Sequence, residues 1–324
     1  CVPAQNHAMD PEAERAYKAD YMAKREQARH SFAGDVVPEL YITIMDLSDD
    51  ELERELDRTW GQGGFYTQYP YTDIFTDKRA NDRVMAYSHR HIRSRVNDPG
   101  VADLLCARDH PIGTKRLCAD TLYFETYNED NVHLVDLNDT PIRAIREDGI
   151  ATSDRAYEVD AIVYATGFDA MTGALLKVDI TGRGGTRLAD AWAAGPRTFL
   201  GLQVHGFPNM FTITGPGSPS VLSNMLVSIE QHVDWISDCI AHMDQHQLRS
   251  IEPTAEAESN WIEHVNDVAK GTMFTAPSCN SWYLGANIPG KPRIFMPYVG
   301  GVGTYRKKCD DIASNNYAGF VLSP

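Results

Sequence analysis

The stretch VDAIVYATGFDA, residues 159–170, decides how the chain is interpreted. Its first half, up to Tyr164, combines β-branched and small apolar side chains, which predicts a short buried strand. Ala165-Thr166-Gly167 then leaves almost bare backbone at the carboxyl end of that strand. Small residues at such a position indicate that another backbone or a ligand comes close. These residues alone do not say which ligand it is, so the rest of the sequence is needed to infer its identity.

The residues around this stretch predict strands that alternate with helices. Further strands are predicted over 131–137, 197–202 and 210–214, in addition to 158–165, with the turn EDGIATSD at 147–154. Two helices are predicted over 223–243 and 255–270. Apolar residues at spacings of 3 and 4 define the buried face of the first, namely Leu226, Ile229, Val233, Ile236, Ile240 and Met243. We therefore expect an α/β sheet from residue 112 onward.

Residues 1 to about 110 are predicted to be mainly helical. Asp10-Pro11-Glu12 combines a capping carboxylate with proline at the first helical position, and its helix should run to about His30. Ser48 and Glu51 have the spacing of a capping box before a second helix. A third helix is predicted over 73–96, with an apolar face that includes Ile74, Val84 and Ile92.

Composition favours small-molecule chemistry. The 324 residues suffice for roughly two domains, and 45 acidic against 30 basic residues give a formal charge of −15. That charge disfavours nucleic acid and anionic membranes as partners. No apolar run reaches the length of a membrane span and no secretory segment opens the chain, so we expect a cytoplasmic protein. Because the chain opens on Cys1-Val2-Pro3-Ala4 without Met, we expect it to derive from a longer polypeptide.

Six cysteines are scattered without the spacing of a metal site or a disulfide scaffold. They are Cys1, Cys106, Cys118, Cys239, Cys279 and Cys309. We expect them to be small core residues or inert surface thiols, and we expect no bound metal.

The stretch GPGSPSVLSNM, residues 215–225, allows two interpretations. Its glycines and serines before a helix could present free backbone N–H groups, backed by the positive end of the helix dipole, to an anion or a carbonyl. The alternative is an ordinary Gly/Pro loop before a capped helix. A hydrolase triad of Ser218, His205 and Asp169 can be drawn, but Gly217 and Pro219 around Ser218 do not form a nucleophile elbow.

Phosphate-binding fingerprints are absent from the sequence. No GxGxxG follows a predicted strand and no GxxxxGK[ST] occurs. Gly61-Gln62-Gly63-Gly64 lies in a helical context and is interpreted as a linker.

Four stretches together resemble the Baeyer-Villiger monooxygenases, flavin enzymes of the cyclohexanone and phenylacetone monooxygenase type. The resemblance covers essentially the whole chain in order and is carried by residues 113–133, 160–172, 196–235 and 281–301. It implies two interleaved Rossmann-like domains that bind FAD and NADPH, with a helical insertion. The implied parts are 1–111 for the insertion, 112–164 for the remainder of the NADP domain and 165–324 for the FAD domain. Because the family's glycine-rich fingerprints lie upstream of the matching segment, we expect the carboxyl-terminal three-fifths of such an enzyme.

The resemblance assigns residues in this chain. Arg116 matches the family's active-site arginine, which lies beside the flavin and stabilises the anionic peroxyflavin and its adduct with a ketone; a guanidinium stays charged and offers several donors to an oxyanion. Lys115 matches a lysine that reaches the NADP phosphate or ribose, and Trp282 matches a tryptophan on a mobile loop that contacts NADP. The other expected cofactor-binding residues are Thr166, Gly167, Phe168, Asp169, Leu222, Ser223, Asn224 and Met225. Ser220, Val221 and Leu222 are expected to line the substrate pocket.

The implied reaction uses NADPH and O₂ to form a flavin peroxide that attacks a ketone, giving an ester or lactone. The chain departs from the family at Glu129, where members often have arginine, and we interpret this as a surface difference. Two alternatives stay open. One is the sister class of flavin monooxygenases that oxidise nitrogen or sulfur, against which Arg116 and the long insertion argue. The other is a chain that is not catalytic alone, because it lacks the phosphate-binding loops.

Overall fold

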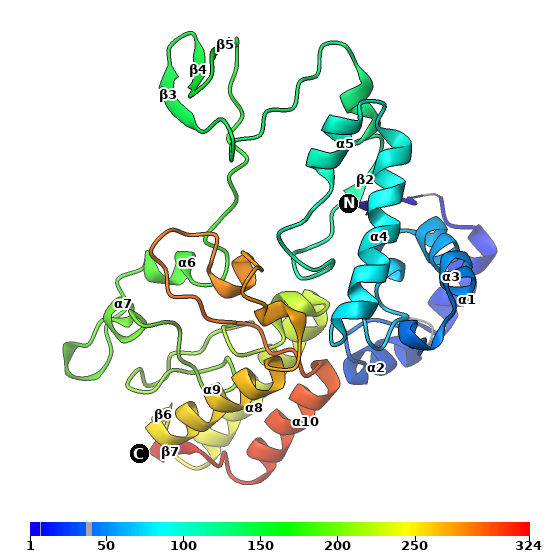
Figure 1. The fold of residues 1–324 in the computed structure, drawn as a ribbon. Coiled ribbons are helices and arrows are strands. Elements are labelled where there is room, and N and C mark those ends of the chain that lie inside the picture. Colours follow the sequence, from blue (N-terminus) through cyan, green and yellow to red (C-terminus); the bar gives the residue numbers. More distant parts are fainter. Residues whose placement is uncertain (7, 37–40) are drawn as a thin grey trace. The chain divides into compact units, whose positions relative to one another are not determined.

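The computed structural model describes residues 1–6, 8–36 and 41–324, drawn as a ribbon in Figure 1. The chain divides into two compact units. Unit 1 comprises Cys1–Gln5 with Ile42–Phe168, and unit 2 comprises Asn6–Tyr41 with Asp169–Pro324. Each unit has its own hydrophobic core. The domain boundaries expected from the family resemblance stay predictions, because the two compact units do not show which residues bind FAD and which bind NADP.

Unit 1 combines three helices with two small sheets. The helices are α3 (Asp49–Gln62), α4 (Lys78–Arg95) and α5 (Pro99–Leu105). The strands are β1 (Val2–Pro3), β2 (Ala119–Asp120), β3 (Ile142–Arg146), β4 (Gly149–Thr152) and β5 (Ala156–Glu158). Strands β1 and β2 pair in parallel, whereas β3, β4 and β5 form an antiparallel sheet in that order.

The predicted capping box starts α3. The Ser48 side chain accepts a hydrogen bond from the Glu51 N–H, and the Glu51 carboxylate accepts one from the Ser48 N–H at 2.9 Å. The helix then buries Leu52, Leu56 and Trp60 in the core of the unit. This prediction is confirmed because its determinants are local.

Helix α4 begins five residues later than predicted, at Lys78. Residues 73–76 form a turn instead, since the Asp73 carboxylate accepts hydrogen bonds from the N–H groups of Ile44 (2.9 Å) and Met45 (3.0 Å). Asp77 then caps the helix. A side chain committed to a distant backbone segment thus sets the start of the helix.

The strand predicted over 158–165 is wrong beyond Glu158. Residues 161–169 have no regular secondary structure, and the side chains of Val163 and Phe168 are 89% and 85% exposed. A strand is stable only where a neighbour satisfies its backbone groups, and the described residues pair no strand with this stretch. The strand predicted over 131–137 is also wrong: the local sheet is formed instead by β3, β4 and β5, whose first turn lies within EDGIATSD.

Unit 2 is built mainly of helices. They are α1 (Pro11–Ala19), α2 (Tyr21–His30), α6 (Gly173–Leu176), α7 (Leu188–Ala191), α8 (Met225–Gln245), α9 (Ala255–Ala269) and α10 (Val302–Ser314). Strands β6 (Ser250–Pro253) and β7 (Phe320–Ser323) form an antiparallel pair. The mixed α/β class is confirmed for the chain. The strands predicted over 197–202 and 210–214 are wrong, because only isolated bridges from Gln203 to Phe199 and to Phe211 form there.

The first predicted helix is divided in two. Asp10 caps α1 as expected, accepting hydrogen bonds from the N–H groups of Glu12 and Ala13. Asp20 leaves the helical conformation, with φ −109° and ψ 17°, and α2 follows it to His30. Helix α1 buries none of its residues, so packing does not oppose this break.

Helix α8 was placed correctly, but half of its predicted buried face is exposed. Leu226, Val233 and Ile240 are exposed, whereas Trp235 and Cys239 are buried in the core of the unit. The helix carries apolar residues on two stripes, and both satisfy helical spacing. The stripe with Trp235 is buried because its indole donates a hydrogen bond to the Cys309 carbonyl (3.0 Å) and contacts rings from the end of the chain.

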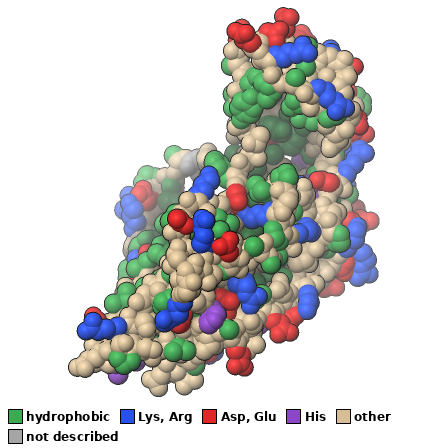
Figure 2. Space-filling model, turned by 90° about the vertical axis from the view of Figure 1, so that its left-hand side faces the viewer, with side chains coloured by type: hydrophobic (Ala, Val, Ile, Leu, Met, Phe, Trp, Pro, Cys, Tyr) green, Lys and Arg blue, Asp and Glu red, His purple; other side chains and the backbone are tan. Residues whose placement is uncertain are grey.

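The surface and the thiols add three observations. On the face drawn in Figure 2, acidic and basic side chains are interspersed rather than collected into a patch of one sign. All six cysteines are free thiols; four are buried and two, Cys1 and Cys118, are exposed. Among the described residues, none of the helices is both long and apolar enough to cross a membrane.

Candidate functional site

A buried asparagine fixes the loop that carries Lys115 and Arg116. The Asn81 side chain, on the inner face of α4, accepts a hydrogen bond from the Ile112 N–H (3.0 Å) and donates to the carbonyls of Ile112 (3.0 Å) and Ile74 (2.9 Å). The buried Thr114 hydroxyl donates to the Pro111 carbonyl at 2.7 Å. Asn81 was not predicted as a functional residue; its place three residues before the buried Val84, on the same helix, is the signal in the sequence that points to it.

The two basic side chains at the end of this loop have different surroundings. Lys115 Nζ lies 3.3 Å from Asp109 Oδ2, and His110 Nδ1 lies 2.6 Å from the other oxygen of that carboxylate. Burial opposes ionisation of Asp109, but the histidine and lysine outweigh it and lower its pKa. The exposed Arg116 places its guanidinium 4.9 Å from the centre of the Phe65 ring. Stacking uses the face of the guanidinium, whereas its donors lie in the plane.

In the glycine-rich loop at 215–218, the N–H groups of Gly217 and Ser218 are engaged within the protein. The Gly217 N–H donates to the Met296 carbonyl (2.7 Å) and the Ser218 N–H to the Gly215 carbonyl (3.1 Å). The Gly217 carbonyl in turn accepts from the Trp261 indole at 3.1 Å. The loop is packed at Gly217 and Ser218, which argues against an anion site at these two residues, and the role of the helix start that follows stays a prediction.

The residues that follow this loop form a short turn before α8. Ser220–Leu222 is a 3₁₀ turn, labelled η5, in which Ser220 is buried with a φ of 45°. The Ser223 hydroxyl donates to the Ser220 carbonyl at 2.7 Å, and Asn224 caps α8 by accepting from the Leu226 N–H at 3.2 Å. The start of α8 therefore combines a fixed turn with the positive end of a 21-residue helix dipole.

Trp282 lies in a second turn, which is connected to the first. The 3₁₀ turn η7 (Trp282–Leu284) is closed against the following segment by hydrogen bonds from the Ile294 N–H to the Leu284 carbonyl and from the Met296 N–H to the Tyr283 carbonyl, both 3.0 Å. The Met296 carbonyl accepts the bond from Gly217 described above. Residues 294–298 thus join the Trp282 turn to the 215–218 loop. The half-buried Trp282 indole N–H makes no hydrogen bond with the described residues.

Asp169 contacts the same region of unit 2. Lys291, nine residues after Trp282, donates hydrogen bonds to the Asp169 carboxylate and to the Thr172 hydroxyl, the second at 2.6 Å. The structure therefore connects Asp169, Trp282 and the 220–225 turn within unit 2. Lys115, Arg116 and residues 166–168 belong to unit 1.

The structure does not assemble the hydrolase triad. Ser218 Oγ donates to the Gly215 carbonyl at 2.7 Å, and His205 Nδ1 bonds to the Pro253 carbonyl at 2.9 Å. Asp169 is paired with Lys291. Each member of the supposed triad is thus committed to a different partner.

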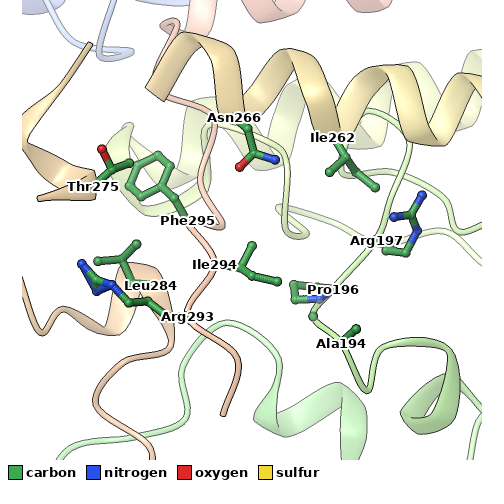
Figure 3. A pocket seen from close by; sticks show the side chains of 11 residues that line it. Ala194, Pro196, Arg197, Ile262, Asn266, Thr275, Leu284, Arg293, Ile294 and Phe295 are labelled. Atoms are coloured by element: carbon green, nitrogen blue, oxygen red, sulfur yellow. The ribbon is translucent and has the colours of Figure 1, made fainter. Parts of the chain in front are cut away.

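A cavity of about 340 Å³ opens beside the Trp282 turn (Figure 3). Ile262 and Asn266 project toward it from α9, and Leu284 and Phe295 also line it. None of the site residues expected from sequence lines this cavity. Its volume lies within the range of small-molecule pockets, although both arginines that line it are engaged: Arg293 donates to two backbone carbonyls and Arg197 pairs with Glu258.

Comparison with curated proteins gives matches along the whole chain, although no family model matches. The chain is 38% identical over 325 residues to acetone monooxygenase (methyl acetate-forming) of Gordonia sp. and 36% identical over 323 residues to a Baeyer-Villiger monooxygenase of Pseudooceanicola batsensis. It is 34% identical over 329 residues to phenazine N-monooxygenase of Lysobacter antibioticus. Each alignment covers 99% of this chain but 58 to 60% of the relative, so the chain spans about three-fifths of their length.

Solved structures agree with these matches. The chain aligns with an oxidized steroid monooxygenase bound to NADP at a TM-score of 0.91 and 44% identity. It aligns with OTEMO in complex with FAD and NADP at a TM-score of 0.94 and 36% identity. The alignments cover 99% and 100% of this chain and 60% of each structure. Both neighbours carry dinucleotides, which supports the expected dinucleotide-binding fold class.

Proposed function

The chain is a homologue of the Baeyer-Villiger monooxygenases along its whole length, and on that premise we propose that it acts as an NADPH- and FAD-dependent monooxygenase. It inserts one oxygen atom of O₂ beside a ketone carbonyl and releases an ester or lactone. The observation that carries this proposal is Arg116, an exposed guanidinium at the end of a loop whose base is fixed by Asn81.

The cofactors of the proposal are FAD and NADPH, and several side chains fit them. Lys115 and Arg116 offer cationic donors to a phosphate or an oxyanion. The turn formed by residues 220–225 leads into the positive end of α8, which favours negative charge on a reduced flavin. Trp282 offers an indole N–H that the described residues leave without an acceptor. The bound flavin supplies the oxygen chemistry, and the glycine-rich phosphate loops are not in this sequence.

Arg116 acts by holding negative charge on oxygen. A guanidinium offers several N–H donors in one plane, so Arg116 can donate hydrogen bonds to an oxyanion. Donors aimed at an oxyanion in a site shielded from water stabilise the transition state more than the ground state. Stacking over Phe65 restricts the side chain beforehand, which lowers the entropy lost when the oxyanion forms.

Ser220, Val221 and Leu222 are proposed to shape the side of the pocket that receives the ketone. They lie in the η5 turn that precedes α8, and the left-handed backbone of Ser220 fixes the direction in which the next two side chains leave. We place the protein in the cytoplasm, with a small ketone and O₂ as its partners and no role for nucleic acid.

Nitrogen oxidation is the second candidate, because one relative at 34% identity is a phenazine N-monooxygenase. The flavin-loaded enzyme that contains this chain is incubated with NADPH, ¹⁸O₂ and either small cyclic ketones or aromatic amines. An ester or lactone that carries one ¹⁸O atom supports the proposal. An N-oxide from the amines, with ketones unchanged, replaces it by the second candidate. A protein that binds no flavin at all refutes both.

A further inference from the structure

Lys291 has the least exposed ammonium-bearing side chain among the ion pairs of the described residues. Its side chain is 14% exposed, whereas the side chain of Lys307, in the pair with Asp311 on α10, is 74% exposed. It hydrogen-bonds to the Asp169 carboxylate and, at 2.6 Å, to the Thr172 hydroxyl. Screening is weak at such a site, so the contacts there count for more than a surface pair does.

The partners of Lys291 are themselves fixed. The Gly173 N–H donates to the Asp169 carbonyl (3.1 Å), and the Leu176 N–H donates to the Thr172 carbonyl (3.0 Å) as α6 begins. A side chain at position 173 would meet the Asp169 side chain at 2.6 Å, so glycine allows the turn to close tightly. Asp169 follows Ala165-Thr166-Gly167 by two residues. The acceptor turn is therefore closed by backbone hydrogen bonds and begins two residues after the stretch proposed to approach a dinucleotide.

Lys291 itself ends the segment that carries Trp282. Gly285 is left-handed (φ 66°), and a side chain there would meet Lys291 Cδ at 3.3 Å, so the lysine stem packs over bare backbone. The Lys291 N–H donates to the Ile288 carbonyl at 3.2 Å. Between these points, Asn287, Pro289 and Gly290 are exposed. The Lys291 ammonium thus attaches this segment to the turn at 169–172 through two side-chain hydrogen bonds.

We propose that Lys291 is a positioning residue: by binding Asp169 and Thr172, it holds the 281–291 segment, and with it Trp282, against the turn that follows Ala165-Thr166-Gly167. The two segments then present one surface to the nicotinamide cofactor. This role deepens the proposed function and depends on it for the identity of the ligand. The attachment itself is a property of unit 2 alone.

The first experiment measures amide hydrogen exchange in the chain without cofactors. Lys291→Met keeps the stem and removes the charge, and Asp169→Asn removes the charge of the acceptor. The matched control is Lys307→Met, which removes an exposed pair at 2.9 Å. We expect exchange over 281–291 to rise about tenfold in the first two variants, with α8 and the control unchanged. Wild-type exchange over 281–291 in Lys291→Met overturns the proposal.

The double variant Asp169→Asn/Lys291→Met distinguishes a shared interaction from two separate effects. Because both substitutions remove one contact, the double variant should exchange no faster than either single variant. Rates that multiply overturn the proposal. Lys291→Arg and Thr172→Val serve as milder variants if Lys291→Met fails to fold: the first should restore slow exchange and the second should raise it by about threefold.

The second experiment uses the flavin-loaded enzyme that contains this chain. Lys291→Met should raise the KM for NADPH about tenfold while kcat changes by less than about threefold, because cofactor binding and not chemistry depends on the attachment. An unchanged KM for NADPH together with faster exchange overturns the cofactor role. Absence of any NADPH oxidation in the wild-type enzyme refutes the proposed function instead, and hydrogen exchange still decides whether Lys291 attaches the segment.

Discussion

At the scale of single residues, the cations and bases of this chain differ in how far water reaches them. Arg116 is exposed and stacks on Phe65, so it can meet a ligand. His232 is fully buried; its Nδ1 accepts from the Thr214 N–H (2.8 Å) and its Nε2 lies 2.9 Å from the Tyr305 hydroxyl. These bonds fix a neutral ring with the proton on Nε2. His232 is therefore a structural residue whose protonation opposes folding.

The pKa of His232 leads to a prediction about acid stability. Burial, with a smaller contribution from Arg306, lowers this pKa to about 4 from 6.5. Between about pH 6.5 and 4, His232 is therefore protonated in the unfolded chain but neutral in the folded chain. The free energy of unfolding keeps its full contribution from this group above pH 6.5 and falls as the pH drops from 6.5 to about 4. The loss from this one group is about 3 kcal/mol.

Urea unfolding at pH 7, 5.5 and 4.5 checks this prediction. The first value lies above the range in which His232 is expected to lower the free energy of unfolding, and the other two lie within it. In His232→Asn, Oδ1 can replace the acceptor Nδ1, and the free energy of unfolding should fall less steeply with acid than in wild type. Parallel curves for the two proteins would contradict the assignment.

At the scale of elements, the helices predicted from sequence are present, whereas the predicted strands are wrong except at Glu158. The caps of α1, α3 and α8 are made within a few residues, so a single sequence contains them. A strand needs a partner from elsewhere, and the stretch after Glu158 has none among the described residues. Helix α8 also depends on contacts from elsewhere in the chain. The spacing of its apolar residues predicted the helix, but the aromatic rings that contact Trp235 determine which of its two apolar stripes is buried.

The caps of α3 and α1 should differ in their effect on stability. Ser48→Ala removes a cap from a helix that buries Leu52, Leu56 and Trp60, and we expect it to lower the free energy of unfolding by about 1 kcal/mol. Asp10→Ala removes a cap from a helix that buries nothing, so only local helicity should be lost. Chemical denaturation followed by tryptophan fluorescence compares the two. An equal decrease in the free energy of unfolding in both variants would show that the cost of losing a cap does not depend on how many residues the helix buries.

The 215–218 loop supplies a second test at this scale. Gly217 has a φ of 89°, and a side chain there would meet Thr198 Oγ1 at 2.9 Å and the Trp261 indole nitrogen at 3.1 Å. Gly217→Ala should therefore cost both backbone strain and overpacking, about 2 to 4 kcal/mol in total.

Gly184→Ala is the matched control for this substitution, because Gly184 has a φ of 65° but no neighbour within 4 Å of the added atom. It should cost only the backbone strain, about 1 kcal/mol. Thermal unfolding of both variants measures the difference. Equal losses would mean that the loop can move away from Thr198 and is not a packed element.

At the scale of the whole molecule, the family and the mixed α/β class could be predicted from the sequence, whereas the roles of the site residues stay predictions. The family resemblance supplied Arg116, Lys115, Trp282 and the 220–225 turn, and the matched relatives bear out the family. Lys291 was not foreseen, because its role comes from a partner 122 residues away. Asn81 was not foreseen for the same reason, since it acts on Ile112, 31 residues later. Sequence patterns identify chemical groups, whereas contacts at long range determine what holds them in place.

We propose that the Arg116 guanidinium stabilises an oxygen anion during ketone oxidation. Rapid-mixing kinetics of Arg116→Ala in the flavin-loaded enzyme that contains this chain test it, with Arg90→Ala as control because Arg90 also stacks on a ring, that of Tyr87. We predict that NADPH still reduces the flavin within about threefold of the wild-type rate while ester formation falls by about 10² or more, and that the control is unchanged. Ester formation at the wild-type rate in Arg116→Ala would show that Arg116 does not stabilise this anion.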